Sequence, residues 1–222
     1  MRVFFKGQIE PDLEITDEST IRHLHVRRIQ AGEHIELMDG NGHIHHCHIT
    51  AIHRKSAHIK CMSSQHCNKG ATKTLLIAVC RFKTLEIIAQ KACELGIHTI
   101  QPVITDNIGN LPSLDVWHKK VARIQEIMQQ SICQCGNPYL PDISTLKKLD
   151  EIDPTSYTLA DAKGNTCATI KGSILIGPEG GFSDREYNFF DKNNVARLRF
   201  GGFVLRAETA AIIAMSKLSS AL

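Results

Sequence analysis

Long apolar runs are missing from this sequence of 222 residues. Runs such as Leu75 to Cys80 fall far below the ~20 residues that a membrane-spanning helix needs. The opening residues, Met1 to Lys6, also lack the apolar core of a signal peptide. We therefore expect a cytosolic (cytoplasmic) protein that is neither secreted nor embedded in a membrane.

The sequence also lacks a surplus of charge and closely paired cysteines. Its 26 basic and 23 acidic side chains leave a formal charge of only +3, so nucleic-acid binding has to come from local patches. The eight cysteines include no C-x-x-C pair, which predicts reduced thiols that pack as small hydrophobic side chains. With 42% hydrophobic and 22% charged residues, the chain is typical of a soluble protein with one large domain or two compact ones.

The first part of the chain has the pattern of a small β domain, for which we expect residues 1–70. Asp39-Gly40-Asn41-Gly42 predicts a tight turn between two strands. The polar stretch Ser63 to Thr72 is the predicted linker. The expected strands are Ile35 to Met38, His43 to Ile52 and Ala57 to Met62.

From residue 71 to 222 the pattern alternates between strands and helices, which predicts an α/β domain with a largely parallel sheet. Helical spacing runs through Leu85 to Leu95, through Trp117 to Met128 after a Ser113 cap, and through Ala207 to Leu218. Ser183 and Glu186 form a capping box that opens a further helix. The expected strands are Thr74 to Cys80, Ile97 to Ile104, Tyr157 to Ala160, Ser173 to Ile176 and Val195 to Phe200.

Two glycine-bearing segments follow expected strands of this sheet. Gly177-Pro178-Glu179-Gly180-Gly181 comes between a buried strand and the capped helix, and Phe200-Gly201-Gly202 precedes the segment Leu205 to Ala210. In parallel sheets, ligands bind beyond the carboxyl ends of the strands. The first loop lacks the lysine of a P-loop and the spacing of a dinucleotide fingerprint. Its pattern alone leaves a tight structural turn as open as a binding site. For the second segment, the alternative is that Glu208 and Thr209 only stabilise the helix start and that Arg206 is a surface residue.

Together these motifs resemble the signature of the ribosomal RNA small subunit methyltransferase E family, of the SPOUT superfamily. The resemblance rests on Gly177-Pro-Glu-Gly-Gly-Phe-Ser183 followed by Leu205-Arg-Ala-Glu-Thr-Ala210, and it extends to His23-Leu-His-Val-Arg-Arg28 and to Gln90-Lys-Ala-Cys-Glu-Leu-Gly96. It implies a PUA-like, RNA-binding β-barrel before a trefoil-knotted α/β methyltransferase domain. It also implies S-adenosylmethionine (SAM) as cofactor, a homodimer, and methylation of a uridine N3 in 16S ribosomal RNA.

The resemblance assigns roles to individual residues of both motifs. Arg206 is expected to hold the uracil oxygens or a phosphate, and Glu208 to act either as a base or as the residue that fixes Arg206. Phe182 or Phe203 is a candidate support for the target base, with a core role open for both. Backbone groups of three loops are expected to bind SAM: Leu159, Ala160, Ile176, Gly177, Pro178, Glu179, Gly180, Gly181, Phe200, Gly201, Val204, Leu205, Thr209 and Ala210.

Some positions depart from the pattern of the resembled family. Ala160-Asp161 stands where a His-Glu pair is usual, Asn137 where an arginine is common, and Phe203 where an arginine is frequent. These departures affect the expected substrate contacts more than the SAM site, because binding by backbone groups tolerates side-chain changes.

Basic and histidine side chains concentrate in the first domain. The expected RNA-binding residues are Arg22, His25, Arg27 and Arg28. His46 and His48 fall on one face of a predicted strand without a convincing third ligand, so we expect no metal site. Three other functions stay open: a SPOUT methyltransferase for another rRNA or tRNA base, an inactive RNA-binding homologue, and a metal-binding protein.

Overall fold

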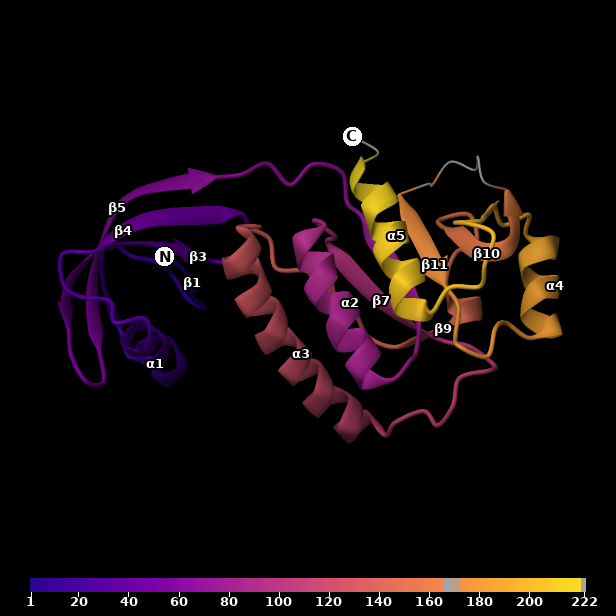
Figure 1. Cartoon of the computed structure of the whole chain (residues 1–222), viewed down its shortest axis with the longest axis horizontal. Helices are drawn as coiled ribbons and strands as arrows, with labels where there is room; N and C mark the ends of the chain where they lie inside the picture. The colour runs from indigo at the N-terminus through magenta and orange to yellow at the C-terminus, as the bar shows by residue number, and fades with distance from the viewer. Residues whose placement is uncertain (166–169, 171, 221–222) are drawn as a thin grey trace. The chain divides into compact units, whose positions relative to one another are not determined.

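A computed structural model describes residues 1–165, 170 and 172–220 of the chain (Figure 1). The chain divides into two compact units. The first comprises Met1–Gly70 together with Gln129–Leu140, and the second comprises Ala71–Met128 together with Pro141–Leu222.

The first unit is a five-stranded sheet with one helix. The strands follow the order β1-β3-β4-β5-β2, and all pairs are antiparallel except β1 with β3. Leu24 of the helix is fully buried with Leu37 and Ile49 of the sheet, and these side chains form the core of the unit. The elements are β1 (Arg2–Phe4), β2 (Asp12–Ile15), α1 (Glu18–Val26), β3 (His34–Met38), β4 (His43–Ile52) and β5 (Ala57–His66).

Helix α1 and the strands β1 and β2 lie where no element was predicted. The side chain of Asp17 caps α1 by accepting a hydrogen bond from the backbone N–H of Thr20 at 2.8 Å. The buried residues of this nine-residue helix are Thr20, Ile21 and Leu24, a stripe too short to give a clear helical period.

The segment Gln129–Leu140 is bound to the first unit by its backbone. The N–H of Leu140 donates to the carbonyl of Gly40 at 2.9 Å, and the N–H of Gly42 donates to the carbonyl of Pro138 at 3.1 Å. The hydroxyl of Tyr139 donates to the carbonyl of Cys67. A domain boundary placed after residue 70 therefore leaves out a segment that completes the first unit in the structure.

The second unit contains a parallel sheet in the order β12-β10-β11-β6-β7-β8, with β9 also paired to β7. Every strand pair in it is parallel, so the carboxyl ends of the strands share one edge. The strands are β6 (Thr74–Ala78), β7 (Thr99–Ile104), β8 (Asp142–Ile143), β9 (Lys147–Lys148), β10 (Thr158–Asn165), β11 (Ser173–Ile176) and β12 (Arg197–Leu198).

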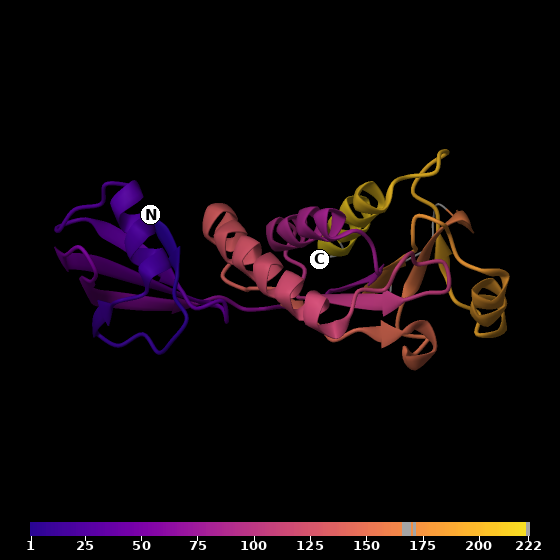
Figure 2. The same ribbon diagram turned by 90° about the horizontal axis from the view of Figure 1, so that it is seen from below.

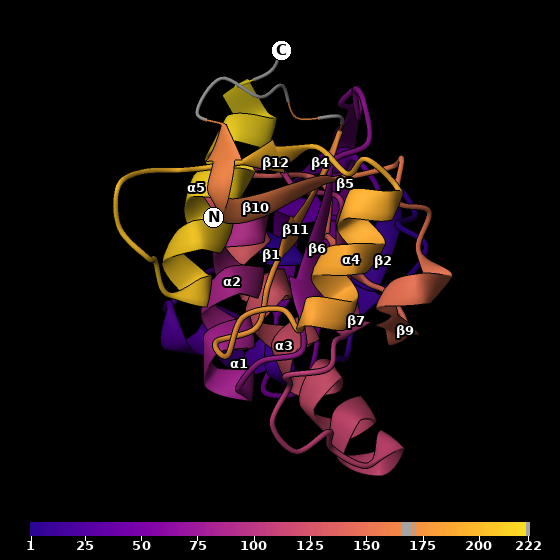
Figure 3. The same ribbon diagram turned by 90° about the vertical axis from the view of Figure 1, so that its right-hand side faces the viewer.

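Helices cover both faces of this sheet. The helices are α2 (Phe82–Glu94), α3 (Leu114–Cys135), the 3-10 turn η1 (Leu149–Glu151), α4 (Asp184–Lys192) and α5 (Ala207–Ser220), with α3 running on into the segment of the first unit. Helices α2 and α5 pack against each other on one face, and α4 lies on the other face (Figures 2 and 3). The continuous apolar runs of β6 and β11 are buried for this reason.

The structure confirms most predicted elements and corrects three. Strand β10, predicted to end at Ala160, continues to Asn165, so the loop expected directly after Ala160 is a strand. Strands β4 and β11 have the predicted bounds, and Ser183 and Glu186 form the predicted capping box. The linker prediction is wrong at its start, because β5 continues to His66 by pairing with β4. The strand predicted from Val195 to Phe200 is reduced to the two residues of β12.

An aromatic cluster between α4 and the sheet supports the loop that leads into α4. Phe190 is fully buried, and its ring meets that of Phe182 edge to face at 4.9 Å between centroids. Tyr187 belongs to the same cluster: its ring centroid lies 6.1 Å from that of Phe182 and 6.3 Å from that of Phe190. Phe182 is partly buried and packs against this core, as one of its two predicted alternatives has it.

We predict that Phe190→Ala lowers the free energy of unfolding by about 3–5 kcal/mol, because it leaves a cavity in this cluster. Urea unfolding followed by far-ultraviolet circular dichroism measures the change. Phe203→Ala is the matched control, since that ring is 89% exposed, and we expect it to change stability by less than about 0.5 kcal/mol. If both substitutions lowered the free energy of unfolding equally, the aromatic cluster would not have the stabilising role assigned to it.

Candidate active site

Residues 160–162 of β10 and the loops that follow β11 and β12 line one cavity at the carboxyl edge of the parallel sheet. Its volume is about 770 Å³, within the range of roughly 300–1,000 Å³ that is usual for small-molecule sites. Arg81, which comes shortly after β6, and the first turn of α5 complete the wall. The site thus lies where parallel sheets bind ligands.

The structure brings together nearly all residues that were predicted to bind the cofactor or to act in catalysis. Two are exceptions: Leu159 is fully buried in the core, and Thr209 is exposed on α5 outside the cavity wall. The predicted residues that line the cavity are Ala160, Ile176, Gly177, Pro178, Glu179, Gly180, Gly181, Phe200, Gly201, Val204, Leu205, Arg206, Glu208 and Ala210.

Two glycines set the path of the loop between β11 and α4. A Cβ on Gly177 would lie 2.6 Å from the ring of Phe182, so only glycine lets the backbone pass the aromatic cluster. Gly181 has a φ of 72° and donates its N–H to the carbonyl of Pro178 at 2.9 Å, a left-handed turn that other residues rarely adopt. The loop therefore presents its backbone to the cavity.

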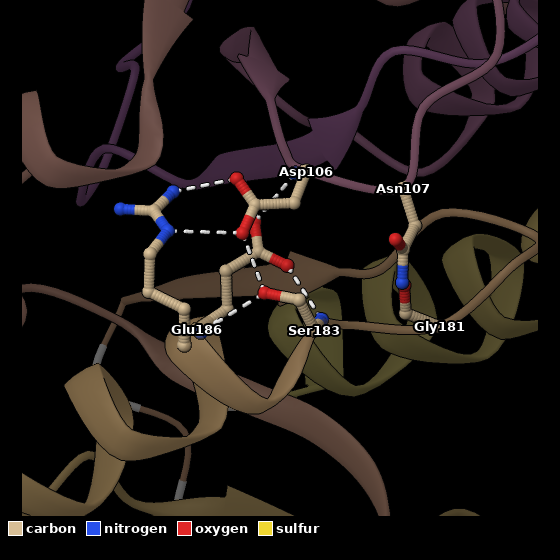
Figure 4. Close-up of polar contacts among 6 residues, drawn as sticks. Asp106, Asn107, Gly181, Ser183 and Glu186 are labelled. Carbon is tan, nitrogen blue, oxygen red and sulfur yellow. Dashed lines mark hydrogen bonds and ion pairs between the residues drawn. The ribbon is translucent and has the colours of Figure 1, made fainter.

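Acidic side chains fix the start of α4 to the loop after β7 (Figure 4). Glu186, which is 1% exposed, accepts hydrogen bonds from the N–H groups of Asp106 and Ser183 at 2.9 and 2.8 Å. Asp106 accepts from Ser183 Oγ at 2.5 Å and from Arg185 Nη2 and Nε at 2.6 and 3.0 Å. Hydrogen bonds from Arg185 and then from Ser183 lower the pKa of Asp106 to about 2.

Asn107 joins the same loop to the glycine turn. Its Nδ2 donates to the carbonyl of Gly181 at 3.0 Å (Figure 4), and a Cβ on Gly180 would come within 3.4 Å of the Asn107 carbonyl. Sequence reasoning missed Asp106 and Asn107. Their only signal is that two polar residues follow closely on the buried strand β7.

At the rim of the cavity, Arg81 forms an ion pair with Glu179 of the glycine loop. Its Nη2 lies 2.9 and 3.1 Å from the two carboxylate oxygens. Burial and the nearby carboxylates of Glu179 and Glu208 raise the pKa of the neighbouring Cys80 to about 12. The thiol of Cys80 therefore stays protonated near neutral pH and is unsuited to nucleophilic catalysis.

Arg206 and Glu208 stand at the start of α5 and both line the cavity. In the described part of the chain, no ion pair joins them, although one was an alternative for Glu208. The guanidinium group of Arg206 is exposed and is left available for a bound anion.

Asp161 places a partly unsatisfied carboxylate in the same wall. Its side chain is 4% exposed; Oδ1 accepts from the N–H of Lys163 at 3.0 Å, and Arg197 Nε lies 3.7 Å from Oδ2. Oδ2 has no hydrogen-bond partner among the residues that the structure describes. A buried acceptor without a donor is costly unless a ligand or water satisfies it.

The predicted RNA-binding residues all belong to α1 and the two residues after it. Arg22 is paired with Glu18 at 2.9 Å, and His25 Nε2 lies 3.1 Å from the carbonyl of His53. Arg27 and Arg28 are exposed and form no ion pair within the described residues. Arg28 has a φ of 56°, which directs the chain away from the helix.

The histidines of the first unit face one another in pairs. The rings of His34 and His48, which are opposite in the β3–β4 ladder, have centroids 5.3 Å apart. His46 lies beside Glu36, with 3.7 Å between Nδ1 and Oε1. Across residues 1–165, 170 and 172–220, no three His, Cys, Asp or Glu side chains are grouped to hold a metal ion.

In the same described residues, no helix is long and apolar enough to cross a membrane.

Comparisons with known proteins agree with the architecture. Residues 68–219 match the family model of an RNA methyltransferase domain, and residues 15–61 match that of an RNA methyltransferase PUA domain. A methyltransferase from Legionella pneumophila, solved with bound SAM, superposes with a TM-score of 0.87 at 27% identity over 99% of this chain and 97% of that one. The expected α/β unit with a small PUA-like unit is thereby confirmed, and the class is that of an RNA methyltransferase.

Relatives with known names identify the family of RNA methyltransferases to which the chain belongs. The ribosomal RNA small subunit methyltransferase E of Helicobacter pylori 26695 is 27% identical over 216 residues, covering 93% of this chain and 94% of the relative. That of Mesomycoplasma hyopneumoniae is 30% identical over 161 residues, covering 68% of this chain and 70% of the relative. The chain belongs to the ribosomal RNA small subunit methyltransferase E family.

We predict that Asp106→Asn lowers the free energy of unfolding by about 0.5–1 kcal/mol at neutral pH, because an amide cannot replace the partly exposed ion pair with Arg185. The folded pKa of Asp106, about 2, is below the ordinary value of 3.8. Its stabilisation is therefore complete above about pH 3.8 and is lost as the pH falls toward 2.

Urea unfolding of the wild type and the variant between pH 2.5 and 7 measures this difference. The gap between the two should be constant down to about pH 4 and then shrink. Asp12→Asn on the exposed edge of β2 is the control and should produce no such gap. If the stability difference between wild type and variant grew as the pH fell, the predicted direction of the pH dependence would be wrong.

Proposed function

We propose that this protein transfers the methyl group of SAM to N3 of a specific uridine in the 16S ribosomal RNA of the small subunit. The single observation that supports this most is the common cavity formed by the two family motifs, Gly177 to Ser183 and Leu205 to Ala210. A ribosomal RNA substrate implies action in the cytoplasm. Family resemblance supports a homodimer as the working form.

The cavity has the features that SAM requires. Strand β10 and the loops after β11 and β12 offer mainly backbone donors and acceptors, and two glycine positions, Gly180 and Gly201, keep side chains out of the way. The Oδ2 of Asp161, which lacks a hydrogen-bond donor among the described residues, suits a cationic ligand or a hydroxyl group. When bound, the cofactor supplies a methyl group on a positively charged sulfur, so the protein has to orient the reactants and manage one proton.

Arg206 and Glu208 are the residues we assign to the substrate side. Uridine N3 becomes a good nucleophile once its proton has left, and negative charge then spreads onto the neighbouring oxygens of the base. The unpaired guanidinium of Arg206 stabilises that charge by donating hydrogen bonds to it. Because Glu208 forms no ion pair with Arg206, we assign it the acceptance of the N3 proton, directly or through a water.

The first unit supplies the contact with the RNA chain. Arg27 and Arg28 carry the positive charges of the predicted patch that have no acidic partner among the described residues, whereas Arg22 is already paired with Glu18. Charges of this kind bind phosphates without reading sequence. We propose that they hold the RNA while the cavity selects the base.

The deciding experiment is transfer of labelled methyl from SAM to small ribosomal subunits taken from cells that lack this modification. Mass spectrometry then locates the label. Label on N3 of one 16S uridine supports the proposal; label on another base identifies a different SPOUT substrate. SAM binding without transfer to any RNA would favour the inactive RNA-binding homologue, consistent with Ala160, Asp161 and Asn137 at the departing positions.

In that assay, we predict that Arg206→Ala lowers the transfer rate by at least about 100-fold, because the developing anion loses its donor. SAM affinity, measured by isothermal titration calorimetry, should change less than about threefold. Arg206→Lys keeps the charge without the planar fork and should recover part of the rate. Equal losses of SAM affinity and of transfer would assign Arg206 to the cofactor instead.

We also predict that Arg27→Gln combined with Arg28→Asn weakens RNA binding and lowers the slope of log K against log salt by up to about 2. Asparagine is chosen at position 28 because it tolerates the positive φ. Fluorescence anisotropy of a labelled 16S fragment at several salt concentrations gives the slope. Lys192→Gln on α4 is the control and should leave the slope unchanged. An unchanged slope in the double variant would show that the RNA does not contact Arg27 and Arg28.

A further inference from the structure

The loop between β12 and α5 exposes two large apolar side chains to solvent. Phe203 is 89% exposed and Val204 is 90% exposed, the highest values of any large hydrophobic residue in the described part of the chain. Figure 3 shows this segment as a long loop that projects from the body of its unit. Two adjacent apolar side chains in water contribute nothing to folding, and exposed apolar surface of this kind marks a candidate binding surface.

Phe203 lies at the mouth of the cavity, whose wall it helps to form. The other aromatic residues of the wall are Phe182, Tyr187 and Phe200. Phe182 and Tyr187 are engaged with Phe190 in the aromatic cluster, and Phe200 is only partly exposed. No ring contact of Phe203 with another aromatic side chain is found among the described residues. Phe203 is therefore the most exposed aromatic side chain of the wall and is open to a ligand.

Unpaired positive charges flank the ring on the same loop. Arg199 and Arg206 are exposed, line the cavity and form no ion pair among the described residues, whereas Arg81 across the rim is neutralised by Glu179. The acidic residues of the wall are Asp161, Glu179 and Glu208. An exposed aromatic ring with two free guanidinium groups on the same loop matches a nucleotide, whose base stacks and whose phosphate is anionic.

We propose that Phe203 is the stacking platform for the target nucleobase after the base leaves its own stack. This inference rests on the proposed function and adds a residue that positions the substrate. Extruding a base costs unstacking energy, which an aromatic protein ring offsets by stacking on the base. The neighbouring glycines, Gly201 and Gly202, have no atoms close to a potential Cβ, which leaves the loop room to bring the ring onto the base.

The first test compares substitutions at position 203 in the methyl-transfer assay. Phe203→Ala and Phe203→Leu should each lower transfer per encounter with RNA about ten-fold, with SAM affinity unchanged. Phe203→Tyr and Phe203→Trp keep a flat ring and should retain most of the activity. Activity in the Leu variant equal to that of the wild type would overturn the proposal, because Leu preserves apolar contact without a stacking face.

The second test places a fluorescent reporter at the ring. Trp117 is the single tryptophan and is buried, so Phe203→Trp in a Trp117→Phe background gives one signal at the loop. With S-adenosylhomocysteine present to prevent turnover, the 16S fragment should quench this emission. The same fragment with an abasic nucleotide at the mapped uridine should quench it at least about threefold less. Equal quenching by both fragments would contradict stacking on the target base.

The controls separate this inference from the proposed function. If the wild-type protein transfers no methyl group to any RNA, the proposed function fails, and the substitutions carry no activity to compare. If the wild type is active and Phe203→Ala is equally active, only the stacking role fails. Sedimentation velocity adds a third outcome: a shift of Phe203→Ala toward smaller species would assign the ring to contact with a second copy of the chain and overturn the proposal.

Discussion

Parallel pairing of the strands in the second unit is the constraint on which the site depends. Because β6, β10, β11 and β12 run in the same direction, residues 160–162 of β10 and the residues that follow β6, β11 and β12 lie at one edge of the sheet. Segments far apart in the sequence, such as Ala160 and Arg206, then face one cavity. An antiparallel strand at any of these positions would send its loop to the opposite edge.

The second requirement is that the loops keep their shape without many side chains. The glycine turn after β11 contains little that could pack, so its form comes from its neighbours: the capping box of α4, the carboxylates of Asp106 and Glu186, and the amide of Asn107. Most of these bonds join side chains to backbone or to charged partners. Preorganised backbone groups suit a cofactor that has to be oriented more than activated.

Much of the second unit could be predicted from the sequence, because its signals are local. Continuous apolar runs gave β6 and β11, helical spacing gave α2 and α5, and the Ser183 capping box fixed the start of α4. The motifs also located most of the cavity wall. Asp106 and Asn107 could not be found this way, because their partners lie 74 to 80 residues away and no periodic pattern records such contacts.

The first unit was harder to predict for a related reason. Helix α1 has too few buried residues to show its period, and β1 is stabilised by parallel pairing with β3, more than thirty residues further on. The polar end of β5, at Ser63 to His66, looks like a linker by composition. It is a strand because His43 to His46 of β4 pair with it, and tertiary pairing of this kind overrides local propensity.

The interleaving of the two units has a consequence for how the chain is made. Gly40, Gly42 and Cys67 bond to residues between Pro138 and Leu140, so the first unit lacks these partners until the ribosome has also synthesised residues 71–128 of the second. At roughly 5–20 residues per second, that delay lasts several seconds. The amino-terminal unit therefore cannot finish folding as an independent early product, and its completion is tied to the emergence of α3.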